Sequence, residues 1–481
     1  MSLIDYWPFE TFRQGQQEVL EQIENSWDNH DVIVCRLPTS WGKTPLSVAI
    51  QNWQLDQSNS TAITVPNNML RDQNIKDWPH LKTVKAMEDY WIESYNMTEK
   101  EFRQRIYKWG PKNSEYNRDR QEAKRVGSPI CVNYYSYIAH KLQRNVVIVD
   151  EAHLLLKTLQ DFSARKLWFH KYRYPNNIRS LHEVKQWVDT LPDSRPIKQL
   201  KDELNSLTPA TLIERGQELY KGDYRACLKL IPLSVENAAP IFWPKKTSKI
   251  VLISATLGEE DVIRMGLGTR RIKWIDTQSP IPAERRAVIP NFVGNMSFAS
   301  QDSNIPALIE RIKQIRESNE GNGFVHASYS LAAKLKRHLN EPWAVYHGRD
   351  REDKQRAYDQ FAATDPSERK VMIGSGMSDG INMCEDIARW QIIAKVPYPS
   401  LAEPAMRWVA KNQPEYYNWM VAREIMQSCG RVCRSPEDYG ITIILDSCFI
   451  KWYNRSKHTL PSWFVDAVQG MEEYENNTKG E

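Results

Sequence analysis

A Gly-Lys-Thr tripeptide directly behind an apolar run constrains the fold of this chain more than any other feature. The run at residues 32–37 is typical of a buried strand, and the segment PTSWGKT at 38–44 follows it. A strand that turns into a helix there directs backbone N–H groups and the positive end of the helix dipole at one point, which suits a phosphate. We therefore predict a phosphate-binding loop lined by Thr39, Ser40 and Gly42, with Lys43 on the β- and γ-phosphates and the Thr44 hydroxyl on Mg²⁺.

The match to the strict loop pattern is incomplete, because Leu37 stands where that pattern has a glycine. The alternative is a chance Gly-Lys-Thr at an ordinary turn, which is common for the tripeptide alone. A second phosphate-chemistry motif behind a second apolar run argues against that alternative.

This second motif is the string DEAH at residues 150–153, behind the apolar run 146–149. Adjacent carboxylates suit two separate tasks. Asp150, at the strand end, would hold the Mg²⁺ shell, and Glu151 would act as general base on the attacking water. The plain alternative is an acidic loop start, and His153 could be a buried polar residue only.

The string QSCGRVCR at residues 427–434 completes the set. Arg431 and Arg434 lie three apart on a predicted helix and so share one face, and Gln427 lies on the same stripe. Arginines delivered onto a γ-phosphate stabilise the charge that develops during phosphoryl transfer. Ordinary surface arginines are the alternative.

The composition describes a protein without membrane or secretory features. The chain has 481 residues, enough for two or three domains, with 26% charged and 41% hydrophobic residues, and no stretch approaches a membrane span. The net charge of +4 permits nucleic-acid binding without demonstrating it. The seven dispersed cysteines form no Cys-x-x-Cys pair, so we expect a reducing cytoplasm, no disulfide framework and no zinc site.

Apolar runs alternate with helical stretches in both halves of the chain, and this pattern predicts an α/β fold with two parallel sheets. The expected strands lie at 32–37, 62–65, 146–149, 250–253, 323–326, 344–346, 371–374, 391–394 and 441–445. The proline-punctuated segment SPIP at 279–282 marks the join. We therefore expect domains at 1–280 and 281–470, followed by a flexible tail at 471–481.

Two accessory segments interrupt the first predicted domain. Residues 155–247 show helix-like patterns at 181–191, 196–207 and 211–228, so we expect a helical insertion. Residues 98–125 hold nine Lys or Arg against five acidic residues, with four aromatics interleaved. Cations with aromatics suit a nucleic-acid strand, and a solvated helix with inward aromatics is the alternative.

The motifs, in their order along the chain, resemble those of superfamily 2 helicases of the XPD/DinG (Rad3-like) branch. The segment FRQGQ at 12–16 resembles the nucleotide-reading Q-motif. Five further segments resemble motif Ia, the Val-Asn-His segment, motif IV, motif V and a Pro-Phe-Pro-Ser loop, at residues 64–68, 132–135, 324–329, 374–382 and 396–400. The resemblance spans about residues 7–446.

This resemblance implies two RecA-like (P-loop NTPase) domains with ATP and Mg²⁺ in the cleft, and arginines supplied by the second domain. Gln16 would bond the adenine, with Trp7 or Phe9 stacking on it. A link from His153 to the hydroxyls of Ser254 and Thr256 would couple the site to movement. Three further residues are expected on the nucleotide: Arg13, Asp379 and Gly380.

Nucleic acid is the implied partner, above all forked or branched DNA, and we expect a monomer that binds no membrane. Hydroxyls and amides would hold backbone phosphates without reading bases. The residues expected there are Asn67, Asn133, Ser328, Tyr329 and Ser378.

One departure concerns the iron–sulfur domain of the family, which needs four cysteines between the phosphate loop and the acidic box. This chain has only Cys131 there after Cys35, so we expect no cluster. The insertion that would correspond to the family's arch domain is also short. A compact motor of this kind is similar to bacteriophage branch-migration helicases.

The expected activity is ATP-dependent unwinding or branch migration of DNA in replication, recombination or repair. A translocase that moves on duplex without separating strands is one alternative, and an RNA motor is another. A nucleotide-gated binding scaffold without turnover is a third. The intact Lys43, Glu151 and arginine pair argue against the scaffold.

Overall fold

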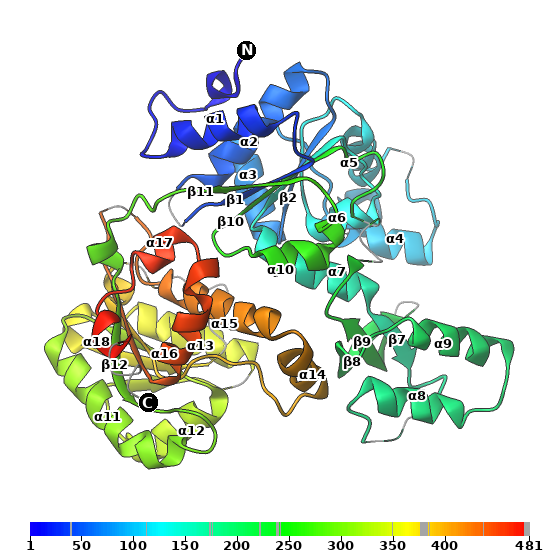
Figure 1. Cartoon of the computed structure of the whole chain (residues 1–481). Helices are drawn as coiled ribbons and strands as arrows, with labels where there is room; N and C mark the ends of the chain where they lie inside the picture. The colour runs from blue at the N-terminus through cyan, green and yellow to red at the C-terminus, as the bar shows by residue number, and fades with distance from the viewer. Residues whose placement is uncertain are drawn as a thin grey trace. The chain divides into compact units, whose positions relative to one another are not determined.

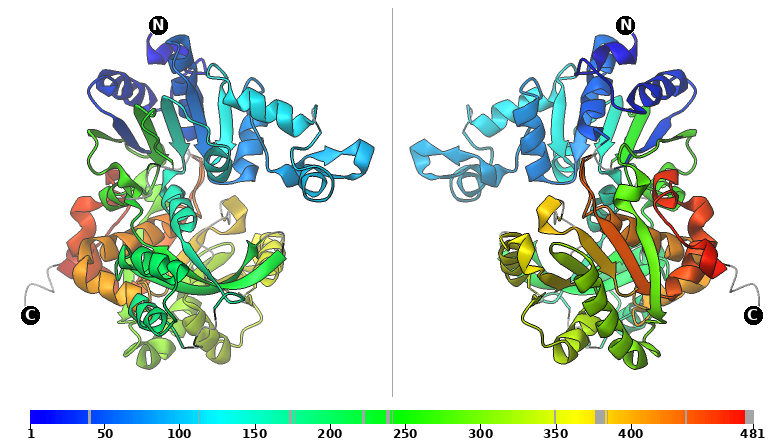
Figure 2. Two further views of the ribbon diagram at one scale, coloured as in Figure 1. Left: turned by 90° about the vertical axis from the view of Figure 1, so that its right-hand side faces the viewer. Right: turned by 90° about the vertical axis from the view of Figure 1, so that its left-hand side faces the viewer.

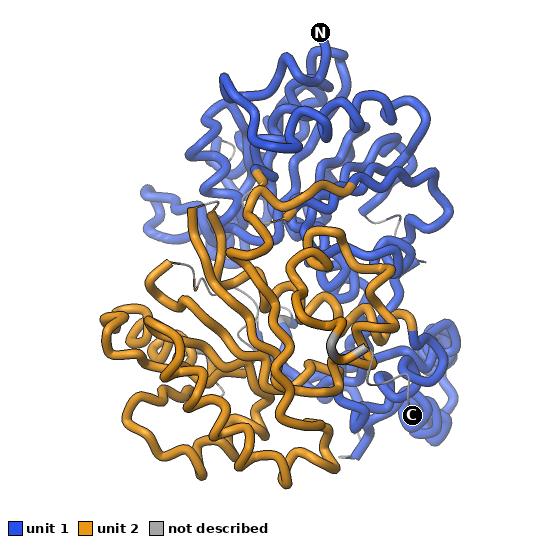
Figure 3. Tube along the Cα trace, turned by 60° about the vertical axis from the view of Figure 1, so that its left-hand side comes forward, with its two compact units in different colours: residues 1–37, 42–275, 400–414 blue, residues 38–41, 276–399, 415–481 orange. Residues whose placement is uncertain are grey.

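The computed structural model describes the chain as two compact units. The described residues are 1–475, except 39, 40, 112, 173, 174, 176, 221, 222, 237–239, 241, 349, 376–382, 384 and 436. The first unit comprises residues 1–37, 42–275 and 400–414, and the second 38–41, 276–399 and 415–481 (Figure 3). Five of the predicted site residues lie outside the described residues: Thr39, Ser40, Ser378, Asp379 and Gly380.

A six-stranded sheet forms the centre of the first unit, in the order β11-β1-β10-β6-β2-β5 (Figure 1). The pairings of β1, β10, β6, β2 and β5 are all parallel, so the carboxyl ends of these strands share one edge. The strands are β1 (Val32–Arg36), β2 (Thr61–Val65), β5 (Ile130–Asn133), β6 (Val146–Asp150), β10 (Lys249–Ser254) and β11 (Ile272–Asp276).

These strands are buried on both faces because helices cover the sheet, which explains their continuous apolar runs. The helices of this part are α1 (Gln16–Ser26), α2 (Lys43–Asp56), α3 (Asn68–Asp77), α6 (Tyr134–Ala139), α7 (Leu155–Ser163) and α10 (Glu259–Val262). The four strands predicted from apolar runs in this unit are confirmed. β5 and β11 were not predicted.

The basic segment forms a small module beside the sheet. An antiparallel pair, β3 (Trp91–Ile92) and β4 (Met97–Thr98), leads into α4 (Glu99–Arg105) and then α5 (Glu115–Lys124). The part that carries β3, β4 and α4, light blue in Figure 2, projects beyond the central sheet of the first unit. Phe102 and Tyr116 are buried, as the alternative with inward aromatics predicts, whereas Tyr107 and Trp109 are exposed. Binding of a nucleic-acid strand by this segment stays a prediction.

The insertion at 155–247 is not all-helical, and the prediction of a helix at 211–228 is wrong. Helices α8 (Leu181–Asp189) and α9 (Arg195–Asn205) lie where helices were predicted. The third segment instead forms a hairpin of β8 (Thr211–Tyr220) and β9 (Asp223–Pro232), and β7 (Arg165–Trp168) pairs with β9.

The cause of this error is long-range packing. Leu228 and Leu230 of β9, with Leu167 of β7, pack against the apolar faces of α8 and α9. This packing stabilises the segment as a sheet. The periodicity of the local sequence contains no information about such long-range contacts. A further helix, α14 (Pro404–Asn412), also belongs to the first unit and contacts β8.

The second unit is built on another six-stranded sheet, in the order β12-β17-β16-β13-β15-β14, with every pairing parallel. Its strands are β12 (Val288–Gly294), β13 (Gly323–His326), β14 (Ala344–Tyr346), β15 (Val371–Gly374), β16 (Trp390–Ile393) and β17 (Ile441–Asp446). All five predicted strands are present, and β12 was not predicted.

Seven helices are described around this second sheet: α11 (Gln301–Ser318), α12 (Tyr329–His338), α13 (Arg351–Ala362), α15 (Pro414–Cys429), α16 (Cys448–Ser456), α17 (Ser462–Val465) and α18 (Glu472–Glu475). Two parallel sheets with helices on both faces are the α/β architecture that the sequence predicts. Within the predicted tail at 471–481, α18 spans Glu472–Glu475, and residues 476–481 lie outside the described residues. Within the described ranges, the search for a helix of sufficient length and apolarity to span a bilayer found none.

Candidate functional site

Lys43 and Glu151 meet at the carboxyl edge of the first sheet. Gly42 caps α2 with a φ of +98°, a conformation that glycine adopts without strain, and Lys43 is the first residue of that helix. The Lys43 Nζ lies 2.9 Å from Glu151 Oε1. The predicted phosphate-binding lysine and the predicted general base are therefore paired across the ends of β1 and β6.

Asp150 ends β6 as a buried carboxylate beside this pair. Its Oδ2 accepts a 3.5 Å hydrogen bond from the Thr44 hydroxyl, and its Oδ1 accepts one of 2.9 Å from the Glu151 N–H. Burial raises the pKa of Asp150 well above its usual range, and the Glu151 charge raises it further while Lys43 opposes the shift. A hydroxyl and a carboxylate at this spacing fit the oxygen ligands that Mg²⁺ prefers.

His153 joins this cluster to the neighbouring strand. Its Nδ1 lies 2.9 Å from the Ser254 hydroxyl at the end of β10, and 3.5 Å from Glu151 Oε2. The Ser254 hydroxyl also accepts a hydrogen bond from the Thr256 N–H at 3.2 Å. The contact between the acidic box and the Ser-Ala-Thr segment is therefore present, and its role in coupling stays a prediction.

Tyr134 is a supporting residue that sequence reasoning missed. It is fully buried in α6, and its hydroxyl donates to the carbonyl oxygens of Asp150 and, at 3.1 Å, Glu151. Glu151 has a φ of +50°, a left-handed conformation uncommon for a residue with a side chain. The tyrosine fixes the backbone at this turn. Its position next to Asn133 in the motif-like segment was the only available signal.

Gln16 lies next to the phosphate-binding loop, since a Cβ at Gly42 would come within 3.0 Å of its Nε2. Its Oε1 accepts a 2.7 Å hydrogen bond from the Arg13 N–H, while the Arg13 side chain is exposed. Trp7 is buried and stacks on Phe12, whereas Phe9 is 56% exposed. Of the two candidate stacking residues, Phe9 is the more accessible.

The sequence predicted the arginine motif of the second unit on a helix, and the structure differs. Helix α15 carries Gln427 but ends at Cys429, so Arg431 and Arg434 lie in the loop that follows. Gly430 disfavours continuation of the helix. A backbone N–H group of the loop instead donates a hydrogen bond to a side chain outside the helix. The prediction that both arginines share a helical face is therefore wrong.

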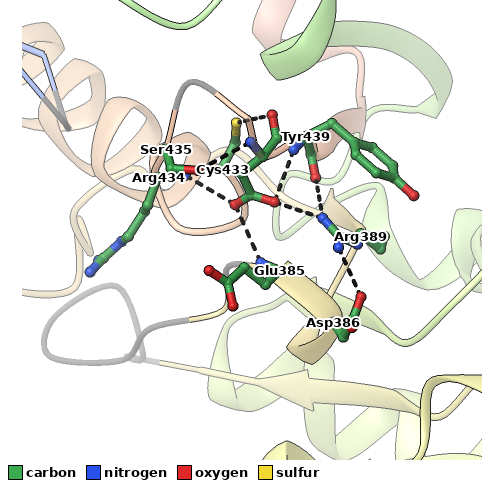
Figure 4. A network of polar contacts seen from close by, with 8 residues as sticks. Glu385, Asp386, Arg389, Cys433, Arg434, Ser435 and Tyr439 are labelled. Carbon is green, nitrogen blue, oxygen red and sulfur yellow. Dashed lines mark hydrogen bonds and ion pairs between the residues drawn. The ribbon is translucent and has the colours of Figure 1, made fainter.

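The accepting side chain is that of Asp438, which is 5% exposed. Its carboxylate accepts hydrogen bonds from the N–H groups of Arg434, Glu385 and Tyr439 at 3.2, 3.3 and 2.9 Å. It also pairs with Arg389 at 2.6 Å. Figure 4 shows the Arg434 side chain extending away from this network, so the guanidinium is presented by a loop whose base is fixed.

A buried polar chain crosses the core of the second sheet. Gln391 is fully buried in the apolar strand β16. Its Oε1 accepts a 2.8 Å hydrogen bond from His326 Nε2, and its Nε2 donates to the Ser428 carbonyl at 2.9 Å. Burial lowers the pKa of His326 to about 4, so this ring is neutral at physiological pH. The chain ties strand β13 to the end of α15, one turn before the arginine loop. A lone glutamine in an apolar strand was the available signal.

The predicted nucleic-acid contacts are mostly helix caps. The side chains of Asn67, Asn133 and Ser328 accept from backbone N–H groups at the starts of α3, α6 and α12. Tyr329 opens α12, with Lys354 Nζ 5.3 Å from its ring. Capping explains these residue types without a ligand. It also leaves helix N-termini at strand ends, where phosphates are favoured.

Ser328 also borders a pocket of about 390 Å³ within the second unit. Its wall includes Ser375, Lys395, Tyr398 and Arg423. Tyr398 stacks on Tyr417 with a centroid distance of 6.0 Å. The wall also includes one carboxylate, that of Glu424. Hydroxyls, two cations and an aromatic ring at one place suit a nucleotide unit.

Comparisons with known proteins agree with this geometry. The family model described as the helicase C-terminal domain matches residues 312–467, and the model for the type III restriction enzyme res subunit matches residues 10–177. These two matches, together with the relatives below, support a superfamily 2 helicase that resembles the XPD/Rad3-like branch. The comparisons give no support to a phage origin.

Among curated relatives, the ATP-dependent DNA helicase CHL1 of Meyerozyma guilliermondii is 27% identical over 116 residues, 20% of this chain and 14% of its own length. The chl1 helicase of Schizosaccharomyces pombe is 30% identical over 111 residues, 19% and 12% of the two chains. These matches span less than a sixth of either relative. A solved structure titled S. tokodaii Xpd4 aligns over 95% of this chain and 99% of its own, with a TM-score of 0.55 and 17% identity, which supports the fold alone.

Proposed function

We propose that this helicase-family chain is an ATP-dependent DNA helicase or translocase. The observation that carries the proposal is the cluster of Lys43, Thr44, Asp150 and Glu151 at one sheet edge, joined to Ser254 through His153. Those groups suit a nucleoside triphosphate and Mg²⁺. A purely structural role does not require a lysine, two carboxylates and a histidine at one place.

Each residue has a distinct task in this proposal. Lys43 exchanges its contact with Glu151 for phosphate oxygens, which frees the Glu151 carboxylate to accept a proton from water. Thr44 and Asp150 would hold Mg²⁺, which supplies charge neutralisation on the phosphates when bound. His153 contacts both Glu151 and the Ser254 hydroxyl at the end of β10. A change in the charge or position of Glu151 would therefore alter the contact between His153 and Ser254.

The second unit would supply Arg434, and with it Arg431, to stabilise the transferring phosphoryl group. Its pocket bordered by Ser328 and Lys395 would hold the DNA backbone. Contacts of this kind read sugar and phosphate rather than bases, so binding should be indifferent to sequence and strongly salt-dependent.

The test is phosphate release and strand separation on single-stranded, forked and four-way substrates of DNA and RNA, at two salt concentrations. We expect ATPase stimulated by DNA and unwinding of forked or four-way DNA, with both activities absent in Lys43→Ala. Stimulation without strand separation would indicate a duplex translocase, and preference for RNA would indicate an RNA motor. Absence of any turnover would refute the proposal.

We further propose that the protein works as a monomer without an iron–sulfur cluster. Cys131 is the only cysteine between Cys35 and Cys227. It is buried in β5, where burial raises its pKa to about 12 and Asn74 Nδ2 lies 3.7 Å from its sulfur. A buried thiol of this kind does not fit a four-cysteine cluster. Iron analysis and a visible spectrum of protein purified without oxygen should show neither iron nor cluster absorbance.

A further inference from the structure

The turn that follows α4 exposes an unusual set of side chains. Tyr107 and Trp109 are 57% and 65% exposed, and Ile106 beside them is 51% exposed. Arg105 and Lys108 alternate with these residues and are exposed as well. We name residues 105–109 the aromatic turn. Large apolar side chains gathered at this exposure on a protein surface usually mark a binding site.

The backbone of the aromatic turn is fixed. The N–H groups of Ile106 and Tyr107 both bond to the Phe102 carbonyl, at 2.8 and 3.1 Å, and the Gly110 N–H bonds to the Tyr107 carbonyl at 3.0 Å. Gly110 has a φ of +71°, and a Cβ there would come within 2.2 Å of Glu99 Oε1. Only glycine therefore allows the turn to close onto α4.

A buried ion pair lies directly beneath the turn. Glu99 is fully buried and lies 2.6 Å from Arg103 Nη2, which also donates to Asn117 Oδ1 at 2.8 Å. The Arg103 guanidinium lies 5.0 Å from the Tyr116 ring. Buried charges are costly unless well paired. Their presence below an exposed, projecting turn indicates a base built to hold that turn in one position.

We propose that the aromatic turn is a stacking platform for the bases of single-stranded DNA. Every base has a π-face, so exposed rings bind unpaired strands without reading sequence. Lys108 Nζ lies 5.3 Å from the centroid of the Trp109 ring, so a cation that can pair with a backbone phosphate lies beside the ring. The segment 98–125 carries nine basic against five acidic residues, a charge that complements DNA. A protein partner would be the other class of occupant for such a surface.

The platform rests on the proposed function, but its test is direct binding, which needs no turnover. Affinity is measured for oligo-dT and for an abasic strand of equal length and charge. Trp109→Ala and Tyr107→Ala should each weaken oligo-dT binding by about tenfold while changing abasic binding by less than about twofold. Trp109→Phe, which keeps a ring, should restore most of the loss.

The matched control is Phe298→Ala, which removes a ring that is 86% exposed in the second unit and should leave both affinities unchanged. Thermal unfolding of each variant verifies that the fold is kept. An equal loss on both strands, or no loss on either, would overturn the platform and favour a protein partner for this surface. Failure of the proposed function would instead appear as wild-type protein that binds oligo-dT without DNA-stimulated ATPase.

Discussion

The two motor sheets and the two accessory segments differ in charge. Segments 98–125 and 155–247 hold 25 Lys and Arg against 15 Asp and Glu, which leaves 39 basic and 45 acidic residues for the rest of the chain. The net charge of +4 therefore hides a basic accessory part and a mildly acidic motor part. This difference fits the proposed division of tasks, in which the motor sheets would carry the chemistry and the accessory segments would attract a polyanion.

Two carboxylates illustrate the same difference locally. Burial raises the pKa of Asp150 in the motor, so its charge there is held against the preference of the fold. Lys166 and Lys229 lower the pKa of Glu218 in the hairpin, so its charge supports the fold. A carboxylate whose pKa is raised by burial is typical of a functional site, whereas a carboxylate whose pKa is lowered by ion pairs is typical of structural support.

The arginine loop gives the largest expected effect. Arg434→Ala should reduce the rate of ATP hydrolysis by about 10³–10⁵-fold, because a guanidinium on the transferring phosphoryl group stabilises the transition state more than the ground state. Nucleotide affinity should fall only modestly. Single-turnover hydrolysis and nucleotide-binding titrations measure the two quantities. Arg337→Ala, at an exposed position in α12, is the control. Unchanged hydrolysis in Arg434→Ala would remove this residue from the site.

Glu151→Gln should give the next largest effect, a loss of about 10²–10⁴-fold in DNA-stimulated turnover, because the amide cannot accept a proton from water. Binding of a single strand should persist, since the substitution leaves the accessory segments intact. Phosphate release and strand binding are measured on the same preparation. Glu259→Gln, an exposed glutamate at the start of α10, should behave as wild type. Full turnover in Glu151→Gln would assign the base elsewhere.

The difference between motor and accessory parts also decides how much the sequence could predict. Parallel strands buried on both faces produce continuous apolar runs, so nine strands and the cluster of Lys43 with Asp150 and Glu151 followed from pattern and motif. The hairpin at 211–232 did not, because its pairing depends on packing against α8 and α9. The loop position of Arg434 depends on a hydrogen bond from its N–H to Asp438. No short sequence motif predicts that Asp438 accepts this bond.

Asp150→Asn tests whether the buried, ionised carboxylate of Asp150 destabilises the fold of the motor. Burial raises the pKa of Asp150 in the folded protein above its unfolded value of about 3.9, so the ionised carboxylate destabilises the fold as pH rises from the unfolded to the folded pKa. The substitution should therefore increase the free energy of unfolding at pH 7.5, by on the order of 1–3 kcal/mol. The gain should vanish near pH 4, where the carboxyl group is protonated.

Denaturant unfolding of Asp150→Asn and wild type at both pH values gives the difference, with phosphate release as the functional counterpart. Turnover should be lost although stability rises. An equal loss of stability at both pH values would mean that the hydrogen bonds of Asp150 matter more than its burial.

Glu218→Gln should produce the smallest change, and it tests the accessory side of the difference. Lys166 and Lys229 lie directly opposite each other in register on β7 and β9, and like charges so placed destabilise a sheet. The Glu218 carboxylate contacts both lysines, at 2.8 Å for Lys166. Because all three side chains are partly exposed, solvent screens the contacts, and we expect a loss of only about 0.5 kcal/mol.

The measurement is amide hydrogen exchange in β8 and β9. Because the pKa of Glu218 is lowered in the fold, its contribution is present above the unfolded pKa and is lost as pH falls, so the effect of Glu218→Gln should fade in acid. Glu214→Gln changes an exposed glutamate on the same strand and should alter exchange less. Slower exchange in Glu218→Gln at neutral pH would mean that the Glu218 charge destabilises the hairpin, as the Asp150 charge destabilises the motor. The proposed difference between the two parts would then be wrong.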